Sequence, residues 1–253
     1  MLKPFYSFFI ATTALMANPN CYSLAYPDLI KSADKTTIVF KNGISLPYKT
    51  TDSRTSWDDK INHADLEMQL SQMYDAGGIQ TPPAYLFDPG RLRYQPFFQA
   101  LYGKDQKEIE KNLVRINWPT LKGSVKLPVN RVGDVDKKLF AIGQEISKLP
   151  KSDRIWAEGA TTYCYRVIKD TNRLSMHSFG IAIDLAPDTT QYWKNEAPNE
   201  TDNIGYKNTM PLSIVRIFEK HGFIWGGRWY HYDTMHFEYR PELLIPSCNE
   251  TSK

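Results

Sequence analysis

The feature that most constrains the fold is a strand pattern that occurs twice in the last third of the chain. In residues 181–185, isoleucine and leucine alternate with Ala182 and Asp184, as expected of a half-buried β-strand. Residues 235–239 carry the same alternation. Helical patterns dominate earlier in the chain and strand patterns come late, which favours an α+β fold. We therefore expect an antiparallel sheet that supports a functional site.

Three segments have the apolar spacing of amphipathic helices. Residues 105–108 have the spacing of a capping box, and an apolar stripe continues from there to Ile116. A second helix is predicted over residues 136–149, before Pro150, and a third over about 211–222, with a glycine at its C-terminal end. Weaker patterns predict a strand over residues 36–40 and a short helix over residues 64–74.

The N-terminus has the features of a secretory signal peptide. Lys3 precedes an apolar stretch over residues 5–16 that is too short to span a bilayer. The sequence Ser-Leu-Ala at 23–25 fits cleavage before Tyr26, and Ala17 offers a second, weaker site.

These patterns divide the chain into a signal peptide (1–25), an N-terminal extension that wraps the core (26–90) and a C-terminal domain (91–253). No later segment is long and apolar enough to span a membrane. We expect a secreted, periplasmic bacterial protein that is soluble and monomeric. The formal net charge of +3 gives little support to nucleic-acid binding.

The chain has three cysteines, Cys21, Cys164 and Cys248. Cleavage before Tyr26 would remove the first, and an oxidising compartment would then allow a Cys164–Cys248 disulfide. A metal-independent enzyme with Cys164 as nucleophile is a weaker alternative, because no histidine lies nearby in the sequence.

Two histidine–carboxylate pairs indicate a metal site. His177 and Asp184 are seven residues apart, an odd spacing that would place them on opposite faces of one strand. Gly180 allows His177 to lie on a turn before the strand, so that Asp184 can point inward from it. His236 and Glu238 share one face of the later strand. Two imidazoles and one carboxylate form a catalytic zinc set with its fourth position open to water.

Spacing alone does not decide which histidines bind the metal. His231 competes, because it lies close to Asp233 and His236 in the sequence. His63 and His221 have no neighbours that indicate a role.

Three segments resemble peptidase family M15, the zinc D-Ala-D-Ala carboxypeptidases and endopeptidases. They are Ser-Met-His-Ser-Phe-Gly-Ile-Ala-Ile-Asp at 175–184, Phe-Ile-Trp-Gly-Gly-Arg-Trp at 223–229, and Asp-Thr-Met-His-Phe-Glu-Tyr-Arg-Pro-Glu-Leu-Leu at 233–244. The resemblance is closest to the branch that includes phage L-alanyl-D-glutamate endolysins, and it extends more weakly back to about Tyr94.

The resemblance implies that His177, Asp184 and His236 bind Zn²⁺. It also implies that Asp233, at a position where the family carries Glu or Asp, is the general base. Arg166 matches an arginine that steadies the oxyanion in the family.

Two further residues are candidates for substrate binding. Ser175 is similar to a family serine near the substrate. Glu238 could orient His236 from behind or bind a substrate amine.

The resemblance implies the hedgehog/D-Ala-D-Ala-peptidase fold, with peptidoglycan stem peptides as substrate. The expected activity is D-alanyl-D-alanine carboxypeptidase, and the alternative is an L-Ala-D-Glu or other cell-wall endopeptidase. A third reading is a non-catalytic relative that keeps zinc for stability. The retained Asp233 argues against it, because a structural site needs no base.

Overall fold

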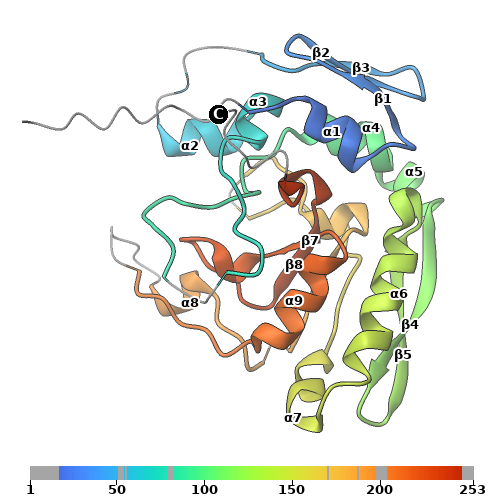
Figure 1. The fold of residues 1–253 in the computed structure, drawn as a ribbon, viewed down its shortest axis with the longest axis vertical. Helices are drawn as coiled ribbons and strands as arrows, with labels where there is room; N and C mark the ends of the chain where they lie inside the picture. Colours follow the sequence, from blue (N-terminus) through green and yellow to red (C-terminus); the bar gives the residue numbers. More distant parts are fainter. Residues whose placement is uncertain are drawn as a thin grey trace, which may run out of the picture.

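The computed structural model describes residues 17–50, 54, 56–78, 82–169, 171–186, 188–197 and 204–246. Over these residues, short helices alternate with small antiparallel sheets, which confirms the predicted α+β class (Figure 1). The described strands form two three-stranded sheets, β1-β2-β3 and β6-β8-β7, and the hairpin β4-β5.

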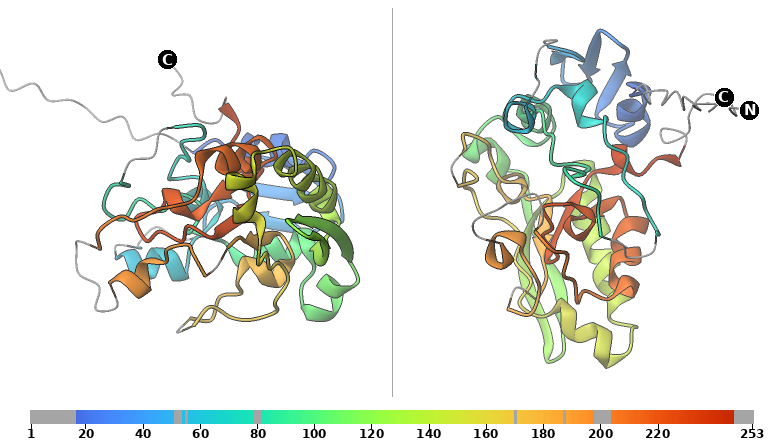
Figure 2. Two further views of the ribbon diagram at one scale, coloured as in Figure 1. Left: turned by 90° about the horizontal axis from the view of Figure 1, so that it is seen from below. Right: turned by 90° about the vertical axis from the view of Figure 1, so that its left-hand side faces the viewer.

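The N-terminal extension shares its core with the rest of the chain. Its elements are helix α1 (Asn20–Ala25) and the strands β1 (Ile30–Ala33), β2 (Thr37–Phe40) and β3 (Ser45–Pro47). Strand β2 confirms the strand predicted over residues 36–40. The ring of Tyr22 in α1 packs 4.9 Å from the ring of Phe97, measured between centroids. Figure 2 shows this sheet at one end of the molecule, with helix α7 at the other.

Helix α1 bears on the predicted cleavage site, because it includes residues 23–25. Cys21 and Tyr22 are buried in the core, and the Tyr22 hydroxyl donates to the carbonyl of Leu66 at 2.8 Å. Cleavage before Tyr26 would remove these contacts, whereas cleavage after Ala17 would leave α1 whole. The signal peptide stays a prediction, and residues 1–16 lie outside the described part of the chain.

The predicted Cys164–Cys248 disulfide is wrong. Cys164 is exposed and carries a free thiol. Cys21, by contrast, is disulfide-bonded. Cys248 lies outside the described residues.

Two short helices follow, α2 (Trp57–Asn62) and α3 (Leu66–Gln69), capped by the side chains of Ser56 and Asp65. The helix predicted over residues 64–74 is therefore cut short. Beyond it, Tyr74 is drawn into the core, where its hydroxyl donates to Glu219 at 2.8 Å. The chain between α3 and Tyr74 must leave the helical conformation for this contact to form.

The stretch after residue 105 is mostly strand. Helix α4 (Gln95–Tyr102) and helix α5 (Gln106–Glu110) precede the hairpin of β4 (Leu113–Thr120) and β5 (Gly123–Asn130). Half of the capping box is present: Asp105 accepts from Glu108 N at 2.9 Å, but the Glu108 carboxylate accepts from Lys104 N rather than from Asp105 N. The predicted continuation of the helix to Ile116 is wrong. Ile116 and Trp118 are buried while Arg115 and Asn117 are exposed, so the effective period is two.

Helices α6 and α9 confirm two predictions. Helix α6 (Val135–Ile146) lies beside the β4-β5 hairpin, and α9 (Leu212–Lys220) ends just before Gly222 (Figure 1). Phe218 of α9 stacks on Phe237 of the central sheet at 4.0 Å between ring centroids. Because Phe237 and His236 point to opposite faces of β8, α9 covers the side of the central sheet away from the candidate site.

The central sheet positions the site. It consists of β6 (Ala182–Asp184), β8 (His236–Tyr239) and β7 (Phe223–Trp225), all antiparallel. Both strands predicted from alternation are present, in β6 and β8. The pairing of these two strands places Asp184 directly opposite His236.

The remaining elements are short. They are α7 (Lys151–Arg154), α8 (Trp193–Glu196) and the 3-10 turns η1 (Val132–Asp134), η2 (Ile155–Ala157), η3 (Met176–Phe179), η4 (Gly226–Arg228) and η5 (Pro241–Leu243). Among the described residues, no helix has the length and apolar character needed to cross a bilayer.

Candidate metal centre and active site

His177 lies on a single turn that leads into strand β6. Turn η3 begins after Ser175, whose hydroxyl accepts from His177 N at 3.4 Å, and it ends at Gly180 in the left-handed conformation, with φ of 68°. A Cβ at Gly180 would lie 2.7 Å from the Leu113 side chain, so the position has no room for one. The predicted turn before the strand is confirmed.

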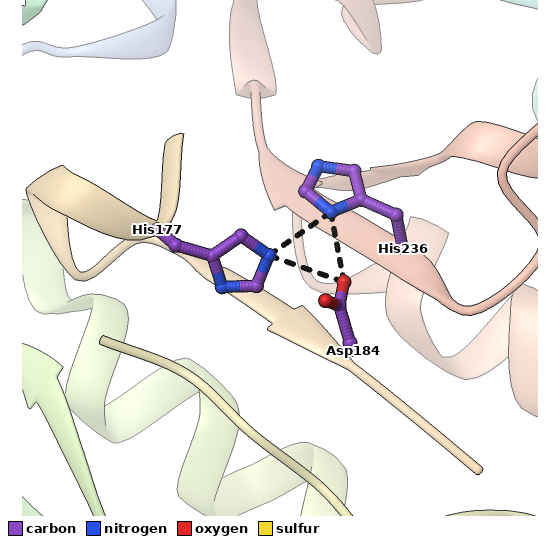
Figure 3. A group of neighbouring side chains, drawn as sticks. All are labelled: His177, Asp184 and His236. Atoms are coloured by element: carbon purple, nitrogen blue, oxygen red, sulfur yellow. Dashed lines mark hydrogen bonds and ion pairs between the residues drawn. The ribbon is translucent and has the colours of Figure 1, made fainter. Parts of the chain in front are cut away.

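His177, Asp184 and His236 converge on one point (Figure 3). His177 Nε2 lies 3.1 Å from Asp184 Oδ1 and 3.2 Å from His236 Nδ1, and His236 Nδ1 lies 2.9 Å from the same carboxylate oxygen. Both imidazoles are buried, while Asp184 is partly exposed. The structure thus brings together the three residues that the sequence proposes as ligands.

Each imidazole has an inner nitrogen, which points toward the convergence point, and an outer nitrogen, which points away from it. The hydrogen bond at the outer nitrogen determines whether the inner nitrogen has a lone pair. Nδ1 of His177 donates to the carbonyl of Thr162, and Nε2 of His236 lies 3.0 Å from Glu238 Oε2. Because these partners accept hydrogen bonds, the inner nitrogens are left with lone pairs that face the Asp184 carboxylate. Three acceptors at this spacing repel one another unless a positive charge lies between them.

The separations fit a tetrahedral metal. Ligand atoms about 2.0–2.1 Å from a tetrahedral centre lie roughly 3.3 Å apart, close to the separations above. The pKa values of Asp184 and His236 also indicate that this site attracts positive charge. Burial opposes ionisation at both groups, but hydrogen bonds hold the pKa of Asp184 well below its usual range and raise the pKa of His236 to about 10. A donor set of two imidazoles and one carboxylate suits zinc.

Glu238 lies behind His236, away from the cavity. It is completely buried, and it binds Arg93 at 3.1 Å and Arg240 at 2.9 Å as well as His236. Burial raises its pKa, but attraction by Arg93 and the hydrogen bond from His236 outweigh it and lower the pKa to about 2. Of the two roles open to Glu238, these contacts match the orientation of His236, because no face of the carboxylate is left for a substrate.

Asp233 lines the cavity next to the ligands. Its Oδ1 is buried and has no hydrogen-bond partner among the described residues. Burial is the main cause that raises the pKa of Asp233, to about 6, and the nearby Asp184 carboxylate adds to it. Gly226 makes room for this turn, since a Cβ there would lie 2.5 Å from the carbonyl oxygen of Asp233.

The cavity over the ligands has a volume of about 140 Å³. Arg166 and Ser175 line it together with the ligands and Asp233. The Arg166 side chain is exposed, and within the described residues it makes no ion pair or hydrogen bond of its own. Ser175 is buried, and its hydroxyl caps the His177 turn.

His231 does not join the ligand group, although it lines the same cavity. Its Nδ1 lies 2.6 Å from Asp88 Oδ2, and its backbone N–H donates to Asp88 Oδ1 at 2.9 Å. Within the described residues, the group that could hold a metal at this site comprises His177, Asp184 and His236.

Sequence reasoning missed the arginines of the cavity wall, Arg91 and Arg93. Their signal is local and weak: the alternation Arg-Leu-Arg, with Leu92 buried, places both guanidinium groups on one side of the chain. Nothing near them in the sequence connects them to a site some 90 residues later.

Residues 169–239 match the family model described as D-alanyl-D-alanine carboxypeptidase, which belongs to the M15 peptidases. The matched segment includes all three converging residues and Asp233. No match was found among curated proteins or among solved structures.

Proposed function

We propose that this chain, which carries a peptidase family M15 segment at residues 169–239, is a zinc-dependent peptidase that cleaves peptidoglycan stem peptides. The observation that carries the proposal is the convergence of three lone-pair donors beside the partnerless carboxylate of Asp233. A purely structural zinc site is closed by a fourth ligand, whereas three ligands leave a position for water.

His177, Asp184 and His236 would hold the metal. When bound, zinc supplies Lewis acidity and lowers the pKa of a bound water. Glu238 and Thr162 hold the outer nitrogens of the two histidines, so that the inner nitrogen of each is the one that would face the metal.

Asp233 is proposed to be the general base. Its partnerless Oδ1 faces the cavity, so it can take a proton from the attacking water and later deliver one to the leaving amine. A pKa raised by burial suits both steps, because the group must accept and release a proton near neutral pH.

Arg166 is proposed to stabilise the charge that develops on the scissile carbonyl oxygen. Its guanidinium lines the cavity without a carboxylate of its own, and a planar, permanently charged group can bind an oxyanion. Ser175 supports His177 through the capping hydrogen bond, and its position on the cavity wall also allows contact with a substrate.

The substrate class follows from the family description, and D-alanyl-D-alanine is the expected cleavage point. The antiparallel sheet that carries two of the ligands is compatible with the hedgehog/D-Ala-D-Ala-peptidase fold. We further propose a periplasmic location, where such peptides occur.

The test is digestion of purified muropeptides by the full chain, with product masses determined with and without a chelator. Loss of one D-alanine that stops on chelation supports the carboxypeptidase. Cleavage between L-Ala and D-Glu would assign an endopeptidase instead, and intact muropeptides with zinc present would refute the proposal.

A further inference from the structure

A second polar hollow adjoins the candidate active site. Its volume is about 690 Å³, and Asn62, Gln95, Thr171, Asn172 and Arg173 line it together with the exposed His63. A small apolar gap lies between the two spaces: it shares Arg93 and Met176 with the active-site cavity, and Gln95 and Arg173 with the hollow. These shared residues place Arg173 and the hollow beside the active-site cavity.

Three guanidinium groups lie close together between the active-site cavity and the hollow. Arg91 pairs with Asp88 at 3.4 Å, and Arg93 pairs with Glu238 at 3.1 Å. Both carboxylates are shared, Asp88 with His231 and Glu238 with His236 and Arg240.

Arg173 is left without a counter-ion. Its Nε is buried and has no hydrogen-bond partner among the described residues, and its Nη1 reaches only the carbonyl of Arg91, at 3.5 Å. Burial and repulsion by Arg93 and Arg91 lower its pKa to about 9. A buried guanidinium without an anion is costly, so the structure leaves Arg173 ready to bind one.

We propose that Arg173 forms a subsite for the free carboxylate of the D-glutamyl residue of the stem peptide, beside the active-site cavity. The hollow's other side chains are three amides, a hydroxyl and the His63 imidazole, which suit the N–H and C=O groups of a peptide. A guanidinium with free N–H groups binds a carboxylate through charge-assisted hydrogen bonds. This inference rests on the proposed function, because it assumes that the substrate peptide crosses the metal centre.

Two peptides test the subsite: L-Ala-D-isoglutamyl-L-Lys-D-Ala-D-Ala and the same peptide with D-isoglutamine, in which an amide replaces the free carboxylate. Dissociation constants for both are measured by calorimetry on the zinc-loaded full chain carrying Asp233→Asn, with and without Arg173→Ala. The acid peptide should bind roughly 10- to 100-fold more tightly than the amide, because a hydrogen-bonded charge pair contributes about 1.5–3 kcal/mol.

Arg173→Ala should bring the ratio of the two constants close to one, and Arg173→Lys should keep part of the preference. The matched control is Arg115→Ala, an exposed arginine on β4, which should keep the full ratio. Equal binding of the two peptides, or an unchanged ratio in a folded Arg173→Ala protein, would overturn the subsite. Acid-selective binding without hydrolysis by the wild-type chain would keep the subsite and refute the peptidase.

Discussion

The tautomers of His177 and His236 are fixed by acceptors at their outer nitrogens, and this local arrangement decides the chemistry of the centre. His231 also has an acceptor at its Nδ1, Asp88 at 2.6 Å, but it does not belong to the group of side chains that converge at the candidate site. Asp233 differs from these three histidines, because its buried Oδ1 has no hydrogen-bond partner among the described residues. These differences separate metal binding from proton transfer at the level of single side chains.

Metal content should distinguish the histidines. His177→Ala and His236→Ala each remove one of three ligands, so both should lose most of the one zinc per chain that we expect in the wild type. His231→Ala is the matched control and should keep it. Elemental analysis after dialysis measures the result, and full zinc retention by His236→Ala would disprove the ligand assignment.

Asp233→Asn should keep zinc but lose about 10²- to 10⁴-fold in kcat, because it keeps the shape and removes the proton acceptor. In the wild type, kcat should fall at acid pH, where protonated Asp233 can no longer accept a proton. A loss smaller than tenfold would mean that another residue is the base.

The same substitution should stabilise the metal-free protein. The pKa of Asp233 is raised to about 6 in the folded state, so its negative charge destabilises the fold above that pH. The Asn variant should therefore be more stable by roughly 1–3 kcal/mol at pH 8. The difference should shrink as the pH falls through 6 and vanish below about 4, the ordinary pKa of Asp. Thermal melts across this pH range measure it, and a less stable variant at pH 8 would contradict the burial argument.

Strand β8 and turn η5 join the metal centre to the N-terminal extension through a buried chain of charges. His236 contacts Glu238, which binds Arg240 at 2.9 Å, and Arg240 binds Glu242 at 2.6 Å. Glu242 accepts in turn from the Tyr26 hydroxyl at 2.7 Å. This segment therefore orients a ligand and anchors the extension at once.

Glu238→Gln tests this segment. It leaves the guanidinium groups of Arg93 and Arg240 without their shared charge, so the protein should lose roughly 3 kcal/mol of stability or more. Zinc affinity should fall about 10- to 100-fold, as for other groups that orient a ligand. Glu67→Gln is the control, because it breaks an exposed pair with Lys49 worth at most about 1 kcal/mol. Wild-type zinc affinity in Glu238→Gln would show that His236 needs no support.

The elements near the site could be predicted from the sequence because their signals are local. Strands β6 and β8 follow from alternation, and the turn at His177 follows from Gly180. The apolar stripe through Ile109 and Ile116 has the spacing of a helix, so it led to the wrong prediction for β4. The period of two in β4 is imposed by its hairpin partner β5, which lies further along the chain. The choice between His177 and His231 depends on which of them converges with Asp184 and His236, and the spacing of histidines in the sequence does not show this. His231 instead binds Asp88, which lies 143 residues away in the sequence.

Over the whole molecule, one hydrophobic core includes residues from both the N-terminal extension and the region of the central sheet. Tyr22, Phe40 and Phe97 belong to it as fully as Phe237 does. The N-terminal extension thus contributes to the same hydrophobic core as the central sheet, so the stability of both regions depends on the same packing.

A chain that begins at Tyr26 should accordingly be less stable than one that begins at Asn18. The shorter chain loses the buried side chains of Cys21 and Tyr22, and each buried large apolar side chain contributes about 1.5–3 kcal/mol. Both melts are measured in reductant, so that loss of the Cys21 disulfide does not contribute. If the chain is secreted, its mature N-terminus should then be Asn18. If the two chains melt at the same temperature, the loss of the buried contacts of α1 no longer argues against cleavage before Tyr26.

The most direct test of the account is a zinc titration of the chelated wild-type chain, with hydrolysis of a stem pentapeptide followed by mass spectrometry. Because His177, Asp184 and His236 form one site beside Asp233, we predict that activity rises linearly and stops at one equivalent of zinc per chain. Full hydrolysis before any zinc is added, or none at any zinc level, would contradict it.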